Sequence, residues 1–301
     1  MGSRGMVFCA AAVAAVTALA SPARAQSSAS EFSTQVGVQV TASIRTNDLQ
    51  QTDLPRRFGH ALVDDGRDLI LNPGASMDEV RRTLLRRAAV YEDVQEYANA
   101  EAELTKALQR TPPIGDTYAA RGYFYMRRGR FADAVGDFVA GMQIDPNNPR
   151  LHFSAGRAES ALGDYAAAVT YYGEAIKLAP REPTYYLARA EADIHLDQPA
   201  GAHSDYDRAI AMRLARPTDR YFAFLGRGYA SLMQADYTGA IADFGTAIEI
   251  NPGSINALMW RGYARERSGQ ITLALDDYER AAAVDPHDRL ARDNLQRLRS
   301  N

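Results

Sequence analysis

A pattern of small, aromatic and proline residues recurs along most of the chain at a spacing of 34 residues. In the stretch 255–286 it consists of Gly262, Ala274, Tyr278, Ala281 and Pro286. Shifted back by 34 residues, the same places hold Gly228, Ala240, Phe244, Ala247 and Pro252. A period of this length marks a protein of stacked repeats, each of which is one supersecondary unit. A repeat array grows without a single large core, so the 301 residues need not form two globular domains.

The same frame fits six consecutive repeats, and the first residue of each is numbered place 1. The repeats run over about 81–112, 115–146, 149–180, 183–214, 221–252 and 255–286. Place 8 is small in all six: Ala88, Gly122, Gly156, Ala190, Gly228 and Gly262. Place 24 is large and mostly aromatic: Leu104, Phe138, Tyr172, Tyr206, Phe244 and Tyr278. Place 20 is alanine throughout.

These places predict two antiparallel helices in each repeat. A glycine inside a helix costs about 1 kcal/mol relative to alanine, so its recurrence at place 8 needs a physical reason. Close approach of two helices supplies that reason, with the bulky place 24 filling the neighbouring space. Glycines near place 15 mark the turn between the helices, and a closing proline stops the second helix in five repeats.

This pattern resembles the tetratricopeptide repeat, over about 206 residues. The resemblance implies an all-α, right-handed superhelical solenoid of about six helix-turn-helix repeats with a concave groove. The fourth repeat departs most from the family, since it ends at Leu214 without a proline and four extra residues follow it. We therefore expect the superhelix to bend or loosen around Leu214–Asp219. Residues 287–301 carry Leu290, Leu295 and Leu298 in an otherwise polar stretch, which predicts a capping helix.

Residues 1–25 have the features of a secretory signal peptide. Arg4 precedes an apolar run from Met6 to Leu19, and Ala23-Arg24-Ala25 supplies small residues for cleavage before Gln26. The alternative, a membrane anchor, needs about 20 apolar residues, which this run does not reach. The sequence therefore predicts export, to the periplasm first and the extracellular space second. Cys9, the only cysteine, lies in this signal, so the mature chain has no thiol or disulfide.

Residues 26–76 form an N-terminal extension that precedes the repeats, which with their flanks occupy residues 77–286. Its first residues are rich in Ser, Ala and Gln, which predicts a flexible lead. Apolar residues then alternate from Val36 to Ile44, and the runs 61–63 and 69–71 flank Asp64-Asp65-Gly66. Two or three short strands capping the first repeat would produce this pattern. An extended tail with one helix is the other interpretation.

Five repeats pair an arginine at place 7 with an acid at place 23. The pairs are Arg87 and Glu103, Arg121 and Asp137, Arg189 and Asp205, Arg227 and Asp243, and Arg261 and Asp277. The third repeat lacks both members together, having Ala155 and Tyr171. This joint presence and absence predicts a structural brace between helices, for which the planar guanidinium is well suited. The functional alternative is a ladder of arginines that binds a ligand.

No catalytic or metal-binding pattern stands out. The five histidines are scattered, and the sequence contains no HExxH, no phosphate-binding glycine loop and no GxSxG. We expect no enzymatic activity, no cofactor and no metal. The mature chain has 32 basic and 37 acidic side chains, a net charge of −5, and so lacks the concentrated basic face that nucleic acids require.

By resemblance, certain places of each first helix line the concave groove. In the N-terminal half these places hold Tyr123, Arg127, Phe153 and Arg157, and in the C-terminal half they hold Phe222, Tyr229, Met259, Trp260, Tyr263 and Arg267. Aromatic side chains on a concave surface are favoured recognition anchors. The alternative is that Trp260 and Tyr263 only pack between adjacent first helices.

The sequence thus predicts a non-catalytic, exported scaffold that binds a protein or peptide in its groove, as an adaptor or assembly factor of the cell envelope. A homo-oligomeric structural protein is the second hypothesis. A glycan-binding accessory protein of the envelope is the third. Fold and partner are connected only by association in repeat proteins, so the partner itself is not predicted.

Overall fold

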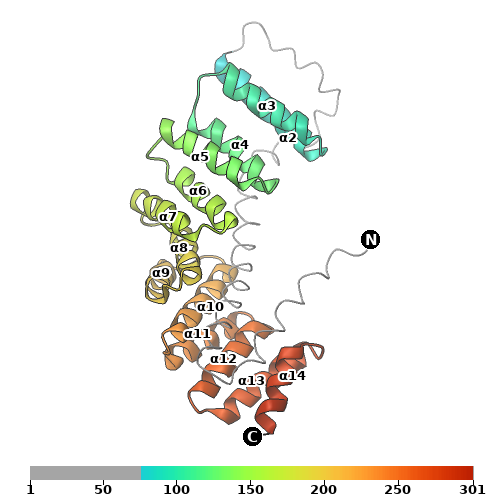
Figure 1. Ribbon diagram of the computed structural model, residues 1–301, viewed down its shortest axis with the longest axis vertical. Coiled ribbons are helices and arrows are strands. Elements are labelled where there is room, and N and C mark those ends of the chain that lie inside the picture. The colour runs from blue at the N-terminus through green and yellow to red at the C-terminus, as the bar shows by residue number, and fades with distance from the viewer. Residues whose placement is uncertain (1–75, 301) are drawn as a thin grey trace. The chain divides into compact units, whose positions relative to one another are not determined.

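The computed structural model describes residues 76–300, and this part of the chain is all-α (Figure 1). Its thirteen helices, α2 to α14, are joined by short turns, and no strand occurs among residues 76–300. The predicted signal peptide and the predicted strands of the N-terminal extension lie outside the described residues. The prediction of an all-α array of helix-turn-helix repeats with a C-terminal capping helix is confirmed for the part described.

The described residues divide between Pro180 and Arg181 into two compact units. The N-terminal unit contains α2 (Met77–Asp93), α3 (Tyr97–Arg110), α4 (Gly115–Arg127), α5 (Phe131–Ile144), α6 (Pro149–Leu162) and α7 (Tyr165–Leu178). The C-terminal unit contains α8 (Pro183–His195), α9 (Pro199–Ala211), α10 (Pro217–Met233), α11 (Tyr237–Ile250), α12 (Ile255–Arg267), α13 (Ile271–Val284) and α14 (Arg289–Arg299). Each predicted repeat holds one consecutive pair of helices.

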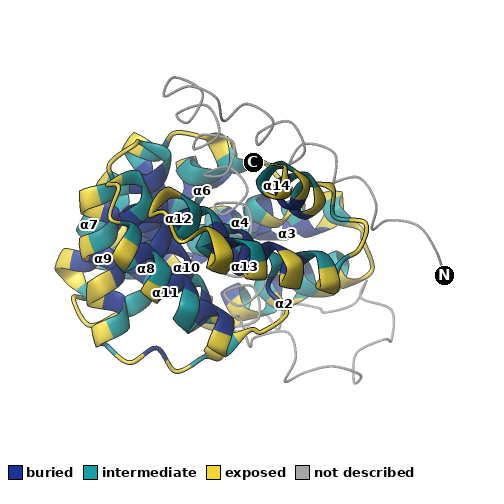
Figure 2. Cartoon of the chain, turned by 90° about the horizontal axis from the view of Figure 1, so that it is seen from below, coloured by how far each residue is buried: buried dark blue, intermediate teal, exposed yellow. Residues whose placement is uncertain are grey.

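The small residue at place 8 lets the two helices of a repeat approach closely. A β-carbon added to Gly122 on α4 would lie 2.8 Å from Cε1 of Phe138 on α5. One added to Gly262 on α12 would lie 2.7 Å from Cε1 of Tyr278 on α13. Both rings are fully buried. The aromatic residue at place 24 thus occupies the space that the glycine leaves, and the buried residues lie on the facing sides of the helices in each unit (Figure 2).

Place 15, between the two helices, has a positive φ in all six repeats. Three of these residues are glycines, with φ of 72° at Gly129, 86° at Gly163 and 81° at Gly269. The other three are Gln95 at 64°, Asp197 at 57° and Ala235 at 58°. The left-handed conformation is easy for glycine and costly for a residue with a β-carbon. The turn geometry is therefore a property of the repeat, which three of the six sequences adopt without a glycine.

Around Leu214–Asp219, where we expect the superhelix to bend or loosen, the structure has a short turn over residues 212–216 followed by the start of a helix. Helix α10 begins at Pro217 and has 17 residues, so the four extra residues form its first turn. Proline suits this position because the first helical residue needs no N–H partner. Four residues make about one helical turn, so the insertion lengthens α10 without rotating its packing face. Within the C-terminal unit α10 packs against α9 as well as α11.

Helix α14 is the capping helix that the sequence predicts. The side chain of Asp288 caps it by accepting a hydrogen bond from the N–H of Ala291 at 2.8 Å. Leu295 is buried against the preceding pair, and α14 packs on α13. The Arg297 guanidinium donates two hydrogen bonds of 2.7 Å to Glu266 on α12. The last repeat is therefore closed by both apolar contact and a bidentate ion pair.

Candidate functional site

The paired charges of places 7 and 23 meet within each repeat that has them. In the N-terminal unit Arg121 on α4 donates from Nε and Nη2 to the two carboxylate oxygens of Asp137 on α5, at 2.8 and 2.7 Å. In the C-terminal unit the same two-pronged geometry joins Arg189 to Asp205 at 2.7 and 2.9 Å, Arg227 to Asp243 at 2.9 and 2.6 Å, and Arg261 to Asp277 at 3.0 and 2.6 Å. These guanidiniums point at the second helix of their own repeat.

The first repeat has a looser version of this pair. The Nε of Arg87 lies 3.4 Å from Glu103, and neither facing atom has a hydrogen-bond partner. The buried Glu103 accepts instead from Lys106 at 2.6 Å. Glutamate is one methylene longer than aspartate, so its carboxylate does not present both oxygens to the arginine in the way that Asp137 does. In the third repeat the fully buried Ala155 replaces the arginine.

The pairing raises the pKa of Arg121, Arg189 and Arg227. Hydrogen bonding to Asp137 raises the pKa of Arg121, and Asp205 does the same for the pKa of Arg189. A guanidinium held in this way stays protonated at any pH the fold survives. The four two-pronged pairs thus link the first and second helices of their repeats, and the first repeat has only the looser contact of Arg87 with Glu103.

In the N-terminal unit, the residues expected to line a groove are mostly engaged with other side chains. The Tyr123 hydroxyl lies 2.7 Å from Oγ of Ser154, and its ring packs edge-on against Phe138. The Arg127 guanidinium donates to both carboxylate oxygens of Glu92, each at 2.5 Å.

The other two expected groove residues of this unit lie together on α6. Phe153 is buried, with its ring centroid 5.7 Å from that of Tyr172 on α7. The Arg157 guanidinium lies 5.8 Å from the Phe153 ring centroid. The aromatic surface of this part of the N-terminal unit therefore packs inside the repeats.

In the C-terminal unit three of the expected residues come together as one cluster, here called the aromatic row: Tyr229 on α10, with Trp260 and Tyr263 on α12. The ring of Trp260 lies edge-on to Tyr229 at 5.5 Å and edge-on to Tyr263 at 5.8 Å. Such edge-to-face pairs add about 0.5–1.5 kcal/mol each beyond the area they bury. Tyr229 is buried, whereas Trp260 and Tyr263 are half-buried.

The remaining expected residues of this unit lie beside the aromatic row or apart from it. Met259 on α12 is buried. Phe222 on α10 is half-buried and packs edge-on against Tyr221, with a centroid distance of 5.0 Å. Tyr229 and Met259 thus belong to the packing of the unit, and the accessible part of the row is formed by Trp260 and Tyr263.

An exposed guanidinium adjoins the aromatic row. Arg267 donates from Nη1 to the Tyr263 hydroxyl at 3.0 Å, and its Cζ lies 5.7 Å from the Tyr237 ring and 5.8 Å from the Tyr263 ring. Tyr263 is the main cause of the raised pKa of Arg267. Within residues 76–300 Arg267 forms no ion pair. It differs in this from Arg127, which occupies the same place in the second repeat and is neutralised by Glu92.

Tyr237 is the neighbour of the row that the sequence analysis missed. It occupies place 17 of the fifth repeat, and this place is also aromatic in three others, as Tyr97, Phe131 and Tyr165. In the N-terminal unit Tyr97 holds Arg128 of the following repeat in the same manner, with Cζ 3.6 Å from the ring. The recurrence of an aromatic residue at place 17 is the signal that would have found both.

The described histidines form no constellation. Burial lowers the pKa of His195 to about 4, so it is neutral near pH 7. His203 has its Nδ1 3.3 Å from Asp207 on the same helix. Among the described residues no group of three His, Cys, Asp or Glu side chains is placed to hold a metal ion. None of the helices within residues 76–300 is long and apolar enough to cross a bilayer.

Comparisons with solved structures show the same fold. YrrB, whose structure is described as a TPR protein with an unusual peptide-binding site, has a TM-score of 0.58 at 16% identity, covering 64% of this chain and 97% of that one. PilF of Pseudomonas aeruginosa has a TM-score of 0.58 at 15% identity, covering 73% and 99%. The C-terminal part of a TPR repeat-containing protein from Cytophaga hutchinsonii has a TM-score of 0.61 at 18% identity, covering 71% and 87%.

Among curated proteins, Protein unc-45 homolog B of Xenopus laevis is 35% identical over 78 residues, which are 26% of this chain. Its counterpart in Xenopus tropicalis is 33% identical over 78 residues. The chain spans only 8% of the length of these relatives.

Two family models, each described as "Tetratricopeptide repeat", match the repeats. One matches residues 149–182, and the other matches residues 85–149 and 225–289. Together these segments cover more than half of the 301 residues. The family and its fold are typically non-catalytic, and its proteins bind protein or peptide partners. By its repeats, its helix pairs and these matches, the chain belongs to the tetratricopeptide repeat family.

Proposed function

We propose that this protein is an exported, non-catalytic scaffold whose C-terminal unit holds a segment of a partner protein against the aromatic row. The single observation that carries the proposal is Arg267, a guanidinium fixed between two tyrosine rings next to Trp260 and Tyr263, with no ion pair inside the described chain. The arginines of place 7, by contrast, are already paired with the acids of place 23 in their own repeats.

The chemistry of this surface favours an extended segment with an apolar side chain beside an acidic group. Half-buried aromatic rings offer a large contact area and lose little side-chain entropy on binding. A guanidinium already held in place loses less entropy when it pairs with a carboxylate, and its planar donors fit both oxygens. The peptide-binding site described for YrrB supports the same class of partner.

The place of work that we propose is the cell envelope, with the periplasm as the compartment and an adaptor or assembly factor as the role. The support is the charged start, apolar run and small-residue cleavage motif of residues 1–25. N-terminal sequencing of the protein purified from fractionated cells tests this. We expect a mature protein that begins at Gln26 and is absent from the cytoplasm; a full-length cytoplasmic protein contradicts export.

The binding test compares two matched arginine variants in a pull-down from envelope extract. Arg267→Glu reverses the charge beside the aromatic row. Arg128→Glu makes the same change in an exposed arginine stacked on Tyr97 and serves as the control. We expect Arg267→Glu to lose the proteins that the wild type and Arg128→Glu retain. Retention of the same proteins by both variants contradicts the proposed surface.

Tyr263→Ala provides a second test that does not depend on charge. Tyr229→Ala is unsuitable, because truncating a buried aromatic residue costs about 3–5 kcal/mol and would unfold the unit instead of exposing the binding role. Circular dichroism confirms that each variant is folded before it is used. Light scattering of the wild type addresses the self-assembly hypothesis: a stable dimer that dissociates on Tyr263→Ala favours homo-oligomerisation over capture of a partner.

A further inference from the structure

One face of helix α2 is exposed where the equivalent face of later first helices is buried. At place 10 the later repeats within the two units have Phe124, Ala158, Ala230 and Ala264, with relative exposures of 2%, 0%, 0% and 0%. The first repeat has Val90 at this place, and it is 46% exposed. The difference lies in the surroundings, since valine is more apolar than the alanines that are buried at this place in three of these repeats.

Place 3 lies seven residues earlier, on the same side of the helix, and behaves in the same way. Thr117, Leu151, Ala223 and Ala257 have exposures of 1%, 2%, 0% and 0%. Thr83 of α2 is only half-buried. We call the side of α2 that carries Thr83 and Val90 its leading face.

The second helix of the preceding repeat covers this face elsewhere. A β-carbon added to Gly141 on α5 would lie 3.2 Å from Cδ2 of Leu151 at place 3 of α6. Helix α10 packs on α9, and α12 packs on α11, in the same order. Helix α2 is the first helix described, so no described helix pair precedes it.

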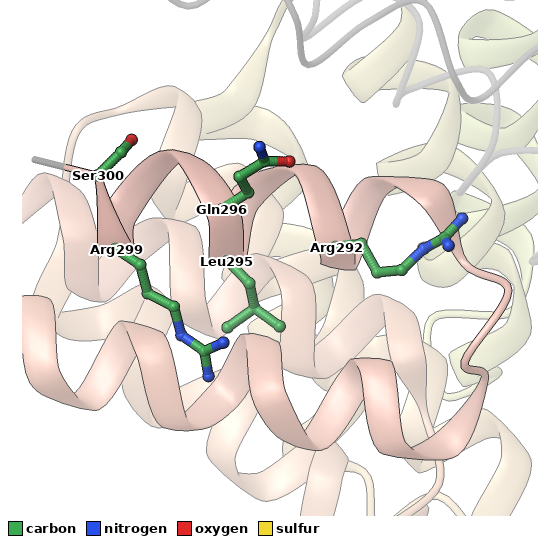
Figure 3. A pocket seen from close by; sticks show the side chains of 5 residues that line it. All are labelled: Arg292, Leu295, Gln296, Arg299 and Ser300. Atoms are coloured by element: carbon green, nitrogen blue, oxygen red, sulfur yellow. The ribbon is translucent and has the colours of Figure 1, made fainter.

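The C-terminal end of the array differs from α2 because a capping helix covers it. Helix α14 covers the last repeat, and its exposed side chains include the polar residues Arg292, Gln296, Arg299 and Ser300. Figure 3 shows Gln296 and Ser300 pointing away from the helices beneath, while Leu295 points toward them. Terminal repeats need such a polar cap for solubility. The leading face of α2 therefore exposes a valine, whereas α14 exposes polar side chains.

We propose that the chain's own N-terminal extension, residues 26–75, docks on the leading face of α2 and covers Val90. The extension joins α2 directly, since Ser76 is the N-cap of α2 and forms a capping box with Glu79. Its apolar runs Ala61-Leu62-Val63 and Leu69-Ile70-Leu71 carry the side chains to cover an apolar helix face. This proposal is independent of the partner proposed for the aromatic row.

The lengths allow this contact. Val90 follows Met77 by 13 residues, which at about 1.5 Å per residue places it roughly 20 Å along α2. An extended chain spans at most about 3.3–3.6 Å per residue. The 13 residue-to-residue steps from Val63 to Ser76 therefore reach roughly 45 Å, about twice the distance required. A tethered segment also acts at a high effective concentration, so modest contacts suffice.

Single cysteines report whether Val90 is covered, because Cys9 is the only natural cysteine. In the full chain carrying Cys9→Ser, Val90→Cys is compared with Val284→Cys, whose parent valine on α13 is 48% exposed. The two sites are equally open in the described residues. If the extension covers the leading face, a thiol reagent will label Val90→Cys at least tenfold more slowly than Val284→Cys.

A second pair of substitutions identifies what covers the site. Leu62→Asp with Ile70→Asp, in the same full chain, should raise the labelling rate of Val90→Cys to that of Val284→Cys and leave the latter unchanged. Equal labelling of both sites without these substitutions overturns the proposal. So does protection of Val90→Cys that survives them, or protection that fades on dilution along with a dimer seen by light scattering, since a second copy is then the cover.

Discussion

At the scale of single residues, Asp277 is the carboxylate of the C-terminal unit that lies close to the most arginines. It is completely buried and accepts hydrogen bonds from Arg261 and from Arg265. Asp277→Ala would leave two largely buried guanidiniums without a counter-charge, and breaking a buried pair in this way costs about 3–5 kcal/mol. The midpoint of urea unfolding should therefore move to a clearly lower urea concentration. Asp133→Ala, which removes an exposed partner of Arg130, should change stability by less than about 1 kcal/mol.

Equal effects of Asp277→Ala and Asp133→Ala would show that the buried pairs contribute no more than surface ion pairs. Replacing both partners of a pair by apolar residues gives the complementary measurement, because a buried pair and a well-packed apolar pair often have similar stability. Arg121 and Asp137 in the N-terminal unit suit this exchange, since the third repeat already folds with Ala155 and Tyr171 at those places.

Ala235 occupies the positive-φ turn place without being a glycine. Its φ of 58° is the left-handed conformation, which costs a residue with a β-carbon about 1 kcal/mol or more. Ala235→Gly should therefore stabilise the protein by about 0.5–1 kcal/mol, after allowance for the greater freedom of glycine in the unfolded chain. Gly129→Ala, at the same place with φ of 72°, is the reverse change and should destabilise. Thermal unfolding midpoints that move the same way in both variants contradict this account.

Asp193 gives the C-terminal unit a pH dependence. Burial first, and the charge of Asp205 second, raise the pKa of Asp193 to about 6. Its unfolded pKa is about 3.9, so the folded state binds the proton more tightly. The resulting stabilisation is complete below the unfolded pKa and is lost as the pH rises through about 6. Unfolding free energies measured from about pH 4 to about pH 7 should fall by more in the wild type than in Asp193→Asn; identical profiles contradict the assignment.

At the scale of elements, the repeat frame made the helix pairs predictable because it combines steric and electrostatic constraints at fixed spacing. Gly122 requires a ring such as Phe138 nearby, and Arg121 requires Asp137, and both pairs span the same two helices. The insertion before the fifth repeat was not predictable in this way. Residues 217–220 have no counterpart in the frame, and only the helix-starting proline hints that they lengthen α10 by a turn.

The candidate site was predictable in its residue types and not in their exposure. Trp260, Tyr263 and Tyr229 were expected on one surface, and the structure places them in contact. The frame could not separate buried Tyr229 and Met259 from half-buried Tyr263, because neighbouring first helices pack at angles that a one-dimensional register does not contain.

Ser254 links two elements of the C-terminal unit through one hydroxyl. Its Oγ caps α12 by accepting from the N–H of Ala257 at 3.1 Å, and it lies 2.6 Å from the Tyr221 hydroxyl of α10. Ser254→Ala removes the cap and leaves a buried phenol unpaired, a loss of about 2–3 kcal/mol. Tyr221→Phe should cost about 1 kcal/mol, and the double variant less than the sum. Additive losses in urea unfolding would show that the hydroxyls do not interact.

At the scale of the whole molecule, stability in a repeat array is approximately a sum of local terms. Each repeat contributes its own pair of helices and its contacts with immediate neighbours, so damage should fade with distance along the chain. The two units, divided at Pro180, provide a boundary against which this fading is measured. The buried Asp277, in the last repeat, lies far along the sequence from α2 to α7 and is well placed for the measurement.

Hydrogen exchange on the full chain carrying Asp277→Ala makes that measurement. We expect amide protection to fall most in α12 and α13, whose helices Asp277 joins through Arg261, and to fall less in α10 and α11. Protection in α2 to α7 should stay at the wild-type value, because Asp277 belongs neither to these helix pairs nor to the repeats next to them. The control, Asp133→Ala, should leave α12 and α13 unchanged. A uniform loss of protection from α2 to α14 would instead make the array a single cooperative unit, in which case a partner bound at the aromatic row would stabilise every repeat equally.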